Sequence, residues 1–196
     1  YLRPTVLRMG TGSFFVGFIM SLYELFTLRE LRLSPALLGT VIAAGGVFAL
    51  LGALFAERIV RRLTYGPAAV GSAIYLGISC LLIPLAHGSV ALCTAFLLAA
   101  QLGDFGWPVA NITEISLRQS VTPAHLLGRV NSAVYLLFRG LVPLGALAGG
   151  AFGDLIGVRT TMLIGASGFL LSTVFIVFSP IRRLHELPVT FEATTA

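Results

Sequence analysis

Charge is scarce in this sequence, and lysine is absent from it. Only 11% of the 196 residues are charged, whereas soluble domains carry roughly 25%. So little charge excludes a disordered chain, a coiled coil and a nucleic-acid-binding protein with a solvated basic face. Hydrophobic residues make up 57% of the chain, and the mean hydropathy is +0.95. The composition argues against a soluble enzyme and predicts a protein whose solvent is lipid.

Residues typical of catalytic or metal sites are also scarce. The two cysteines, Cys80 and Cys93, lie in apolar stretches without metal-ligand spacing, so we expect small buried hydrophobes. The sequence holds no glycine-rich phosphate loop, nucleophile elbow or metal-binding cluster. We therefore expect no enzyme activity, no cofactor and no metal. The chain begins at Tyr1 without a signal-peptide pattern, and we expect it to be a piece of a longer protein.

Long apolar stretches are what the sequence does contain. They cover about residues 9–28, 36–56, 67–86, 89–117, 130–153 and 160–178. Each approaches the ~20 residues that a helix needs to cross ~30 Å of hydrocarbon. Continuous apolar character excludes the alternating strands of a membrane barrel. The predicted fold class is all-α, a polytopic membrane protein with six transmembrane helices, and a soluble helical bundle is the alternative.

The arginines indicate how these helices cross the membrane. Six crossings place both ends of the chain on one side. Three arginines lie on the opposite side, namely Arg29, Arg32 and Arg159. Nine lie on the side of the termini: Arg3, Arg8, Arg58, Arg61, Arg62, Arg118, Arg129, Arg182 and Arg183. The positive-inside rule places that side in the cytoplasm. We expect a bundle over 1–178 and a mostly disordered cytoplasmic tail over 179–196.

The second half of the chain repeats features of the first. The stretch S-P-A-L-L-G-T-V at 34–41 returns as T-P-A-H-L-L-G-R-V at 122–130, with one residue inserted. The acidic helix end at 55–62 returns at 152–159, 97 residues later. Three helices thus repeat as three, and the odd number inverts the second copy, as in secondary transporters. The alternative is chance recurrence, because the composition of transmembrane helices is narrow.

Several short motifs carry a resemblance to a known family. They are S-L-R-Q at 116–119, T-P at 122–123, L-L-G-R-V-N at 126–131 and P-L-G at 143–145. With them the chain resembles the second half of major facilitator superfamily transporters, especially the macrolide- and enterobactin-exporter-like branch. The resemblance covers nearly the whole chain, as helices seven to twelve of twelve. The loop at 57–62 is similar to the superfamily's acidic-basic signature, but Ala53 and Val60 stand where that signature prefers glycine.

The resemblance implies a role for each helix. The first and fourth helices would line a central cavity, the second and fifth would pack against the other half and gate it, and the third and sixth would face lipid. It also implies a bacterial inner (plasma) membrane, a small-molecule substrate, and a missing N-terminal six-helix half as partner. No nucleic-acid partner is expected.

Three charges within the apolar stretches need a reason, because a charge at bilayer depth costs roughly 2.5–3.5 kcal/mol. Asp104 and Arg139 lie about 20 Å and 15 Å from the cytoplasmic side at 1.5 Å per residue, so adjacent helices could pair them. Asp104 would then be the titrating group, with Arg139 tuning the pKa of its carboxyl. Alternatively, the two residues would form a structural ion pair. Glu24 is either a coupling carboxylate facing the cavity or a partner of Arg29 or the headgroups.

The fourth helix carries a polar stripe with one aromatic residue. Gln101, Asp104, Trp107 and Asn111 share one face, which suits either a substrate surface or helix–helix hydrogen bonding. The substrate and proton pathway is therefore predicted to be Glu24, Gln101, Asp104, Trp107, Asn111 and Arg139. Pro108, with Gly103 and Gly106, predicts a bend in this helix. Gly145, Gly149 and Gly153 form a small-residue face that favours tight packing on a neighbouring helix.

A second group of charges lies at the cytoplasmic helix ends. Glu114 and Arg118 are four residues apart and are expected to pair on one face. The resemblance implies a cytoplasmic gate made of Glu57, Arg58, Arg61, Arg62, Glu114, Arg118 and Arg129. Plain topological anchoring by arginine is the alternative.

Together these features predict alternating-access transport. The function expected is proton-coupled efflux of an amphipathic drug or siderophore, with this chain as half of the transporter. The alternative from another class is a non-transporting membrane scaffold or sensor built on a transporter half.

Overall fold

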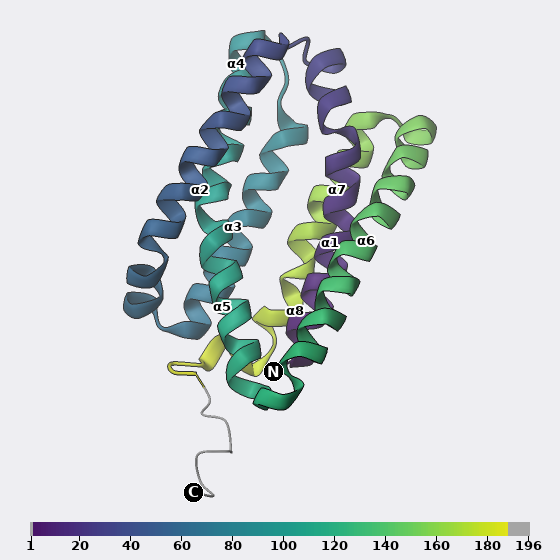
Figure 1. Cartoon of the computed structure of the whole chain (residues 1–196). Coiled ribbons are helices and arrows are strands. Elements are labelled where there is room, and N and C mark those ends of the chain that lie inside the picture. Colours follow the sequence, from purple (N-terminus) through teal and green to yellow (C-terminus); the bar gives the residue numbers. More distant parts are fainter. Residues whose placement is uncertain (1, 188–196) are drawn as a thin grey trace, which may run out of the picture.

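The computed structural model describes residues 2–187, and helices account for every regular element within them. Six helical spans are long and apolar enough to cross a membrane, which confirms the all-α, six-helix prediction (Figure 1). The helices are α1 (Leu2–Leu25) with η1 (Phe26–Glu30), α2 (Pro35–Leu63), α3 (Tyr65–Leu85), α4 (Val90–Gln101), η2 (Leu102–Phe105), α5 (Gly106–Val121), η3 (Ala124–Leu126), α6 (Leu127–Ile156), α7 (Val158–Ser172), α8 (Val174–Val177) and η4 (Pro180–Arg183).

The helices extend beyond the apolar stretches that predict them. α1 begins at Leu2 rather than near Met9, and α2 runs to Leu63 rather than to Ala56. Hydropathy marks only the part of a helix that lipid would surround, whereas backbone hydrogen bonding continues into the charged ends. Pro4 does not prevent the early start, because proline is tolerated in the first turn of a helix.

Side-chain caps begin two of the spans. Ser34 Oγ accepts a hydrogen bond from the Leu37 amide at 3.3 Å, and Ser89 Oγ accepts one from the Leu92 amide at 3.3 Å. Each cap satisfies a backbone N–H that the first helical turn leaves without a partner. The repeat predicts the same role for Thr122, but its buried Oγ1 has no partner among the described residues. The short 3₁₀ turn η3 follows instead, where the second copy carries its inserted residue.

The fourth span is broken in its middle. α4 ends at Gln101, the 3₁₀ turn η2 follows, and α5 resumes at Gly106. Pro108 lacks an N–H and therefore frees the carbonyl of Asp104, four residues earlier. The helix type thus changes where the sequence predicts a bend, and Asp104 lies in the 3₁₀ turn.

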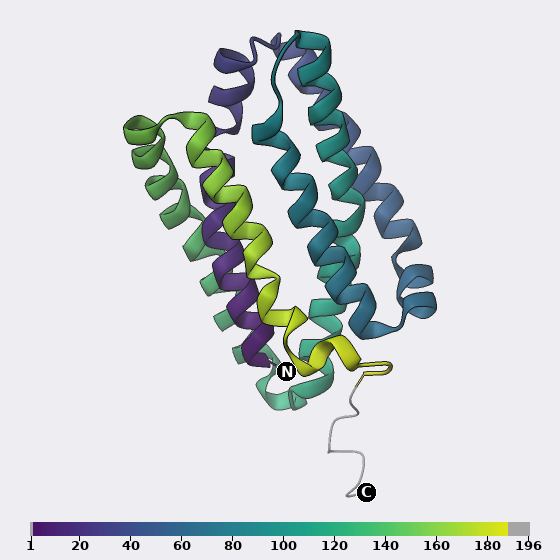
Figure 2. The ribbon, with the colours of Figure 1, turned by 180° about the vertical axis from the view of Figure 1, so that it is seen from behind.

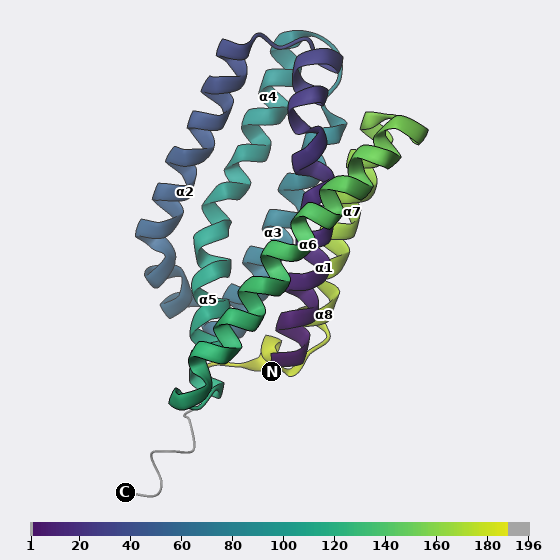
Figure 3. The same cartoon turned by 45° about the vertical axis from the view of Figure 1, so that its right-hand side comes forward.

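The spans form two groups of three. α1 packs on α6 and α7, while α5 packs on α2 and α3, and the groups meet mainly where α3 packs on α7 (Figures 1 and 2). α6 crosses α1 obliquely along the outside of its group (Figure 3). α1 and α5 barely touch each other. Whether the space between α1 and α5 is filled therefore depends on their side chains.

Glycine contacts join the helices in each group, and they follow the predicted repeat. A β-carbon at Gly52 of α2 would collide with the Phe105 backbone, and one at Gly149 of α6 would meet the Phe18 backbone. Gly149 lies 97 residues after Gly52, which is the offset that the sequence repeat gives. The predicted small-residue face of α6 is likewise confirmed, because Gly145 lies directly against Phe14 of α1.

The end of the chain packs more closely than the predicted disordered tail. Ile181 of η4 is 1% exposed, and the Gly66 amide donates to the Leu184 carbonyl at 2.8 Å. Residues 179–187 are therefore seated against the start of α3, which corrects that part of the prediction. The remainder of the predicted tail, 188–196, lies outside the described residues.

Candidate functional site: a charged cavity between α1 and α5

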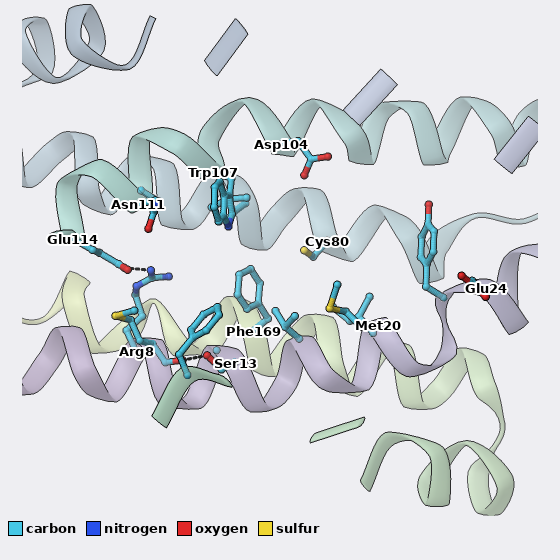
Figure 4. Close-up of a pocket in the computed structure, with 18 residues that line it drawn as sticks. Arg8, Ser13, Met20, Glu24, Cys80, Asp104, Trp107, Asn111, Glu114 and Phe169 are labelled. Carbon is cyan, nitrogen blue, oxygen red and sulfur yellow. Dashed lines mark hydrogen bonds and ion pairs between the residues drawn. The ribbon is translucent and has the colours of Figure 1, made fainter. Parts of the chain in front are cut away.

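A cavity of about 520 Å³ lies between α1 and the η2–α5 segment (Figure 4). One face of α1 forms one wall, with residues spaced three or four apart from Arg8 to Glu24. Asp104, Trp107, Asn111 and Glu114 line the opposite wall. Arg8 and Glu24 are 16 residues apart, so the cavity follows α1 for about 24 Å at 1.5 Å per residue. It is long enough to reach through much of a hydrocarbon layer.

Apolar side chains supply most of the remaining lining. They come from five helices and include Met9, Met20, Leu76, Phe138 and Phe169. Methionine and aromatic side chains adapt to ligands of different shape, because thioethers are flexible and rings offer flat surfaces. A wall of this kind, carrying a few polar groups, is typical of small-molecule sites.

Asp104 is the carboxylate at the middle of the cavity. It is half-buried in η2, and its Oδ2 lies directly over Gly45 of α2, where any β-carbon would collide with it. Among the described residues no ion pair to Asp104 is formed. Gln101, one turn earlier, lies against the same Gly45 and donates through Nε2 to the Val41 carbonyl at 3.1 Å, and it does not line the cavity. Three members of the predicted stripe, Asp104, Trp107 and Asn111, therefore line the cavity, whereas Gln101 contacts α2.

Glu24 lies near the other end of the cavity from Glu114 (Figure 4). Its side chain is exposed, and within residues 2–187 it makes no ion pair. The pairing with Arg29 that the sequence leaves open is not formed. Two unpaired carboxylates, Glu24 and Asp104, therefore line the cavity.

A buried ion pair that the sequence did not predict closes the opposite end. Arg8 of α1 pairs with Glu114 of α5, and only 8% and 12% of these side chains are exposed. The pair joins two helices that otherwise barely touch. Arg8 was counted among the arginines on the side of the termini, and the structure adds that its side chain is buried within the bundle. Arg8, Gly12, Val16 and Glu24 all line the cavity from one long helix, but nothing in their spacing pointed to Glu114 as the partner of Arg8.

Arg118 also takes a different partner from the one predicted. Its Nε donates to Asn131 Oδ1 of α6 at 2.8 Å, while Glu114 is taken by Arg8. The predicted Glu114–Arg118 pair is therefore wrong. Both residues are on α5 as expected, but each meets a side chain from another helix instead.

Arg139 lies away from Asp104. It is exposed on α6 and lines a second, smaller cavity of about 270 Å³ between α5 and α6, to which Asp104 does not contribute. The predicted Asp104–Arg139 contact is wrong. The two residues have similar depths along their helices, but depth does not fix the direction in which a side chain points.

The remaining residues of the predicted gate lie on the surface of this chain. Glu57 and Arg61 are 3.0 Å apart, with about four-fifths of each side chain exposed, and the Arg58 guanidinium lies 5.9 Å from the centre of the Phe55 ring. Arg62 and Arg129 are exposed. Exposed pairs of this kind contribute about 0–1 kcal/mol, so nothing within the described chain depends on them. Their gating role stays a prediction.

Comparisons with known proteins agree with this fold. A family model described as transmembrane secretion effector matches residues 2–193. The chain belongs to this family of the major facilitator superfamily, and it is a multi-pass membrane protein. It is also similar to the multidrug efflux pump Tap of Mycolicibacterium fortuitum, with 31% identity over 156 residues. That match covers 80% of this chain and 37% of the pump, so the chain spans little more than a third of this relative's length. No solved structure matches the chain.

Proposed function

We propose that this chain forms half of a proton-coupled exporter of amphipathic small molecules in a bacterial inner membrane. The observation that carries the proposal is a cavity along α1 and α5 that holds two unpaired carboxylates, Asp104 and Glu24, between apolar walls. Ionisable groups at membrane depth are costly and mark ion or substrate pathways. The family and the similar multidrug pump support transport rather than catalysis.

Asp104 is the proposed proton carrier. It lies within η2, so a change in its charge acts where the span changes from α to 3₁₀ hydrogen bonding. Its unpaired carboxylate can take up a proton on one side of the membrane and release it on the other. Glu24 is the second candidate, nearer the exposed end of the cavity.

The second half of the transporter is proposed to cover α2 and α6. Only 22% and 17% of the apolar windows of these two spans are buried, against 44% in α1 and α3. The cytoplasmic position of both ends follows from the positive-inside rule. In alternating access, the two halves would rock about the cavity.

Efflux of the fluorescent cation ethidium from energised cells tests the coupling role. We expect Asp104→Asn in the full-length protein to reduce efflux driven by a proton gradient at least tenfold, with unchanged amounts in the membrane fraction. Asp154→Asn is the matched control, because Asp154 is an exposed acid on α6 outside the cavity. Normal efflux in both Asp104→Asn and Glu24→Gln would reject both carboxylates as proton carriers. An absence of flux for the unaltered protein would favour the scaffold or sensor alternative.

A further inference from the structure

The second cavity has a different chemistry from the first. It is a groove of about 270 Å³ between α5 and α6, and it adjoins the main cavity because Met9, Trp107, Asn111, Glu114 and Phe138 line both. Its own contributors include Arg118, Tyr135 and Arg139. We refer to it as the inner groove, since it extends toward the Arg118 end of α5.

Arg118 is a largely buried residue whose terminal guanidinium nitrogens have no acceptor among the described residues. The residue is only 5% exposed, and Asn131 is its one hydrogen-bond partner among the described residues, through Nε alone. Its two terminal nitrogens, Nη1 and Nη2, therefore hold no protein acceptor. A guanidinium fixed at Nε with its outer edge free is arranged to receive two oxygen atoms in parallel.

Arg139 adds a second cation from the facing helix. It lines the groove from α6, and within residues 2–187 it has no ion-pair partner. Glu114 is the one carboxylate in the lining, and Arg8 already neutralises it from the α1 side. The groove therefore has excess positive charge, whereas the main cavity has excess negative charge from Asp104 and Glu24.

The groove also has an aromatic wall. Trp107, Tyr135 and Phe138 line it beside the two arginines. Flat rings next to guanidinium groups fit a ligand that joins an oxyanion to an apolar body. A simple hydrated anion would gain nothing from these rings.

We propose that the inner groove binds an oxyanion group, such as a carboxylate or phosphate, that is attached to an aromatic or acyl body. Arg118 and Arg139 hold the oxygen atoms, and Trp107, Tyr135 and Phe138 cover the apolar part. The source is either an amphipathic acid in transit or an anionic phospholipid of the inner leaflet. The inference rests on the proposed function only in treating the groove as part of the substrate route, and binding can be measured without transport.

Trp107 provides a direct readout, since it is the single tryptophan of the chain. We expect 4-iodobenzoate to quench its fluorescence through the heavy atom in the purified full chain in phosphatidylcholine nanodiscs. The half-saturating concentration should rise about tenfold in Arg139→Gln and in Arg118→Gln. Neutral 4-iodobenzamide should quench equally in all variants, because it lacks the charge that the arginines recognise.

The choice of variants separates binding from folding. Arg118→Gln can keep a hydrogen bond to Asn131, and Arg139→Gln alters an exposed side chain. At least one of the two variants should therefore fold and allow 4-iodobenzoate binding to be measured. Arg3→Gln is the matched control, because it removes one exposed positive charge outside both cavities. It should leave 4-iodobenzoate binding unchanged.

A second experiment, with brominated phospholipids, identifies the source of the oxyanion. Dibrominated phosphatidylglycerol would quench Trp107 more than dibrominated phosphatidylcholine if a lipid headgroup occupies the groove, and Arg139→Gln would remove the difference. Arginine-dependent quenching by the benzoate alone would assign the groove to an amphipathic acid. If neither probe depends on Arg118 or Arg139, the proposal is overturned, while ethidium efflux through Asp104 is unaffected by that result.

Discussion

At the scale of single residues, the molecule places its costly charges in two different settings. Asp104 and Glu24 keep contact with a cavity and have no ion-pair partner among the described residues. Arg8 and Glu114 are removed from solvent but neutralise each other. The first arrangement is the one that we propose for proton exchange, whereas the second joins α1 to α5.

The Arg8–Glu114 pair should show strong coupling between its two members. Breaking a buried pair leaves one uncompensated charge, at a cost of about 3–5 kcal/mol. We expect Arg8→Gln or Glu114→Gln alone to lower the thermal midpoint in detergent more than the double variant does. Thermal size-exclusion measurements of the four proteins make a double-mutant cycle. Additive losses would show that the pair contributes nothing as a pair.

Sequence reasoning found the cavity acids but not their surroundings. Asp104 and Glu24 stood out because charge at membrane depth is costly, and this criterion needs no tertiary information. The same criterion did not identify Arg8, because this residue lies outside the apolar stretch at 9–28. The predicted Asp104–Arg139 contact failed because the two side chains line different cavities, and depth along a helix does not fix the direction in which a side chain points.

At the scale of helices, glycine decides how closely the spans approach. Gly145 lies against the Phe14 backbone of α1, while Gly140, on the same helix, has nothing within 4 Å of an added β-carbon. Gly145→Ala should therefore destabilise the bundle by about 1–3 kcal/mol through overpacking. Gly140→Ala should be neutral or slightly stabilising, because alanine is the better helix former. Urea or heat unfolding in mixed micelles measures both.

The repeat extends this expectation to the other group of helices. Gly52 lies against the Phe105 backbone as Gly149 lies against that of Phe18, so Gly52→Ala should cost a similar amount. Equal stability of Gly140→Ala and Gly145→Ala would contradict the close-packing explanation. The sequence predicted the packing of α6, because small residues four apart on an apolar helix let a neighbouring helix approach closely.

At the scale of the whole molecule, the six spans make two three-helix groups with a cavity between them. Hydropathy alone predicted the number and type of spans, since lipid requires long helices with internally satisfied backbones. The partly exposed faces of α2 and α6 belong to the proposed contact with a second half. Their partner could not be predicted from composition, because an apolar face suits lipid and protein equally.

The central claim is that water and substrate follow the α1–α5 cavity through the membrane. It is tested most directly by cysteine accessibility on α5, in a Cys80→Ser, Cys93→Ser background. Asn111 lines both cavities, whereas Ile112 is 42% exposed and lines neither. In intact cells, Asn111→Cys should react with a membrane-impermeant charged thiol reagent and Ile112→Cys should not. Reaction at Ile112→Cys with protection at Asn111→Cys would contradict the account.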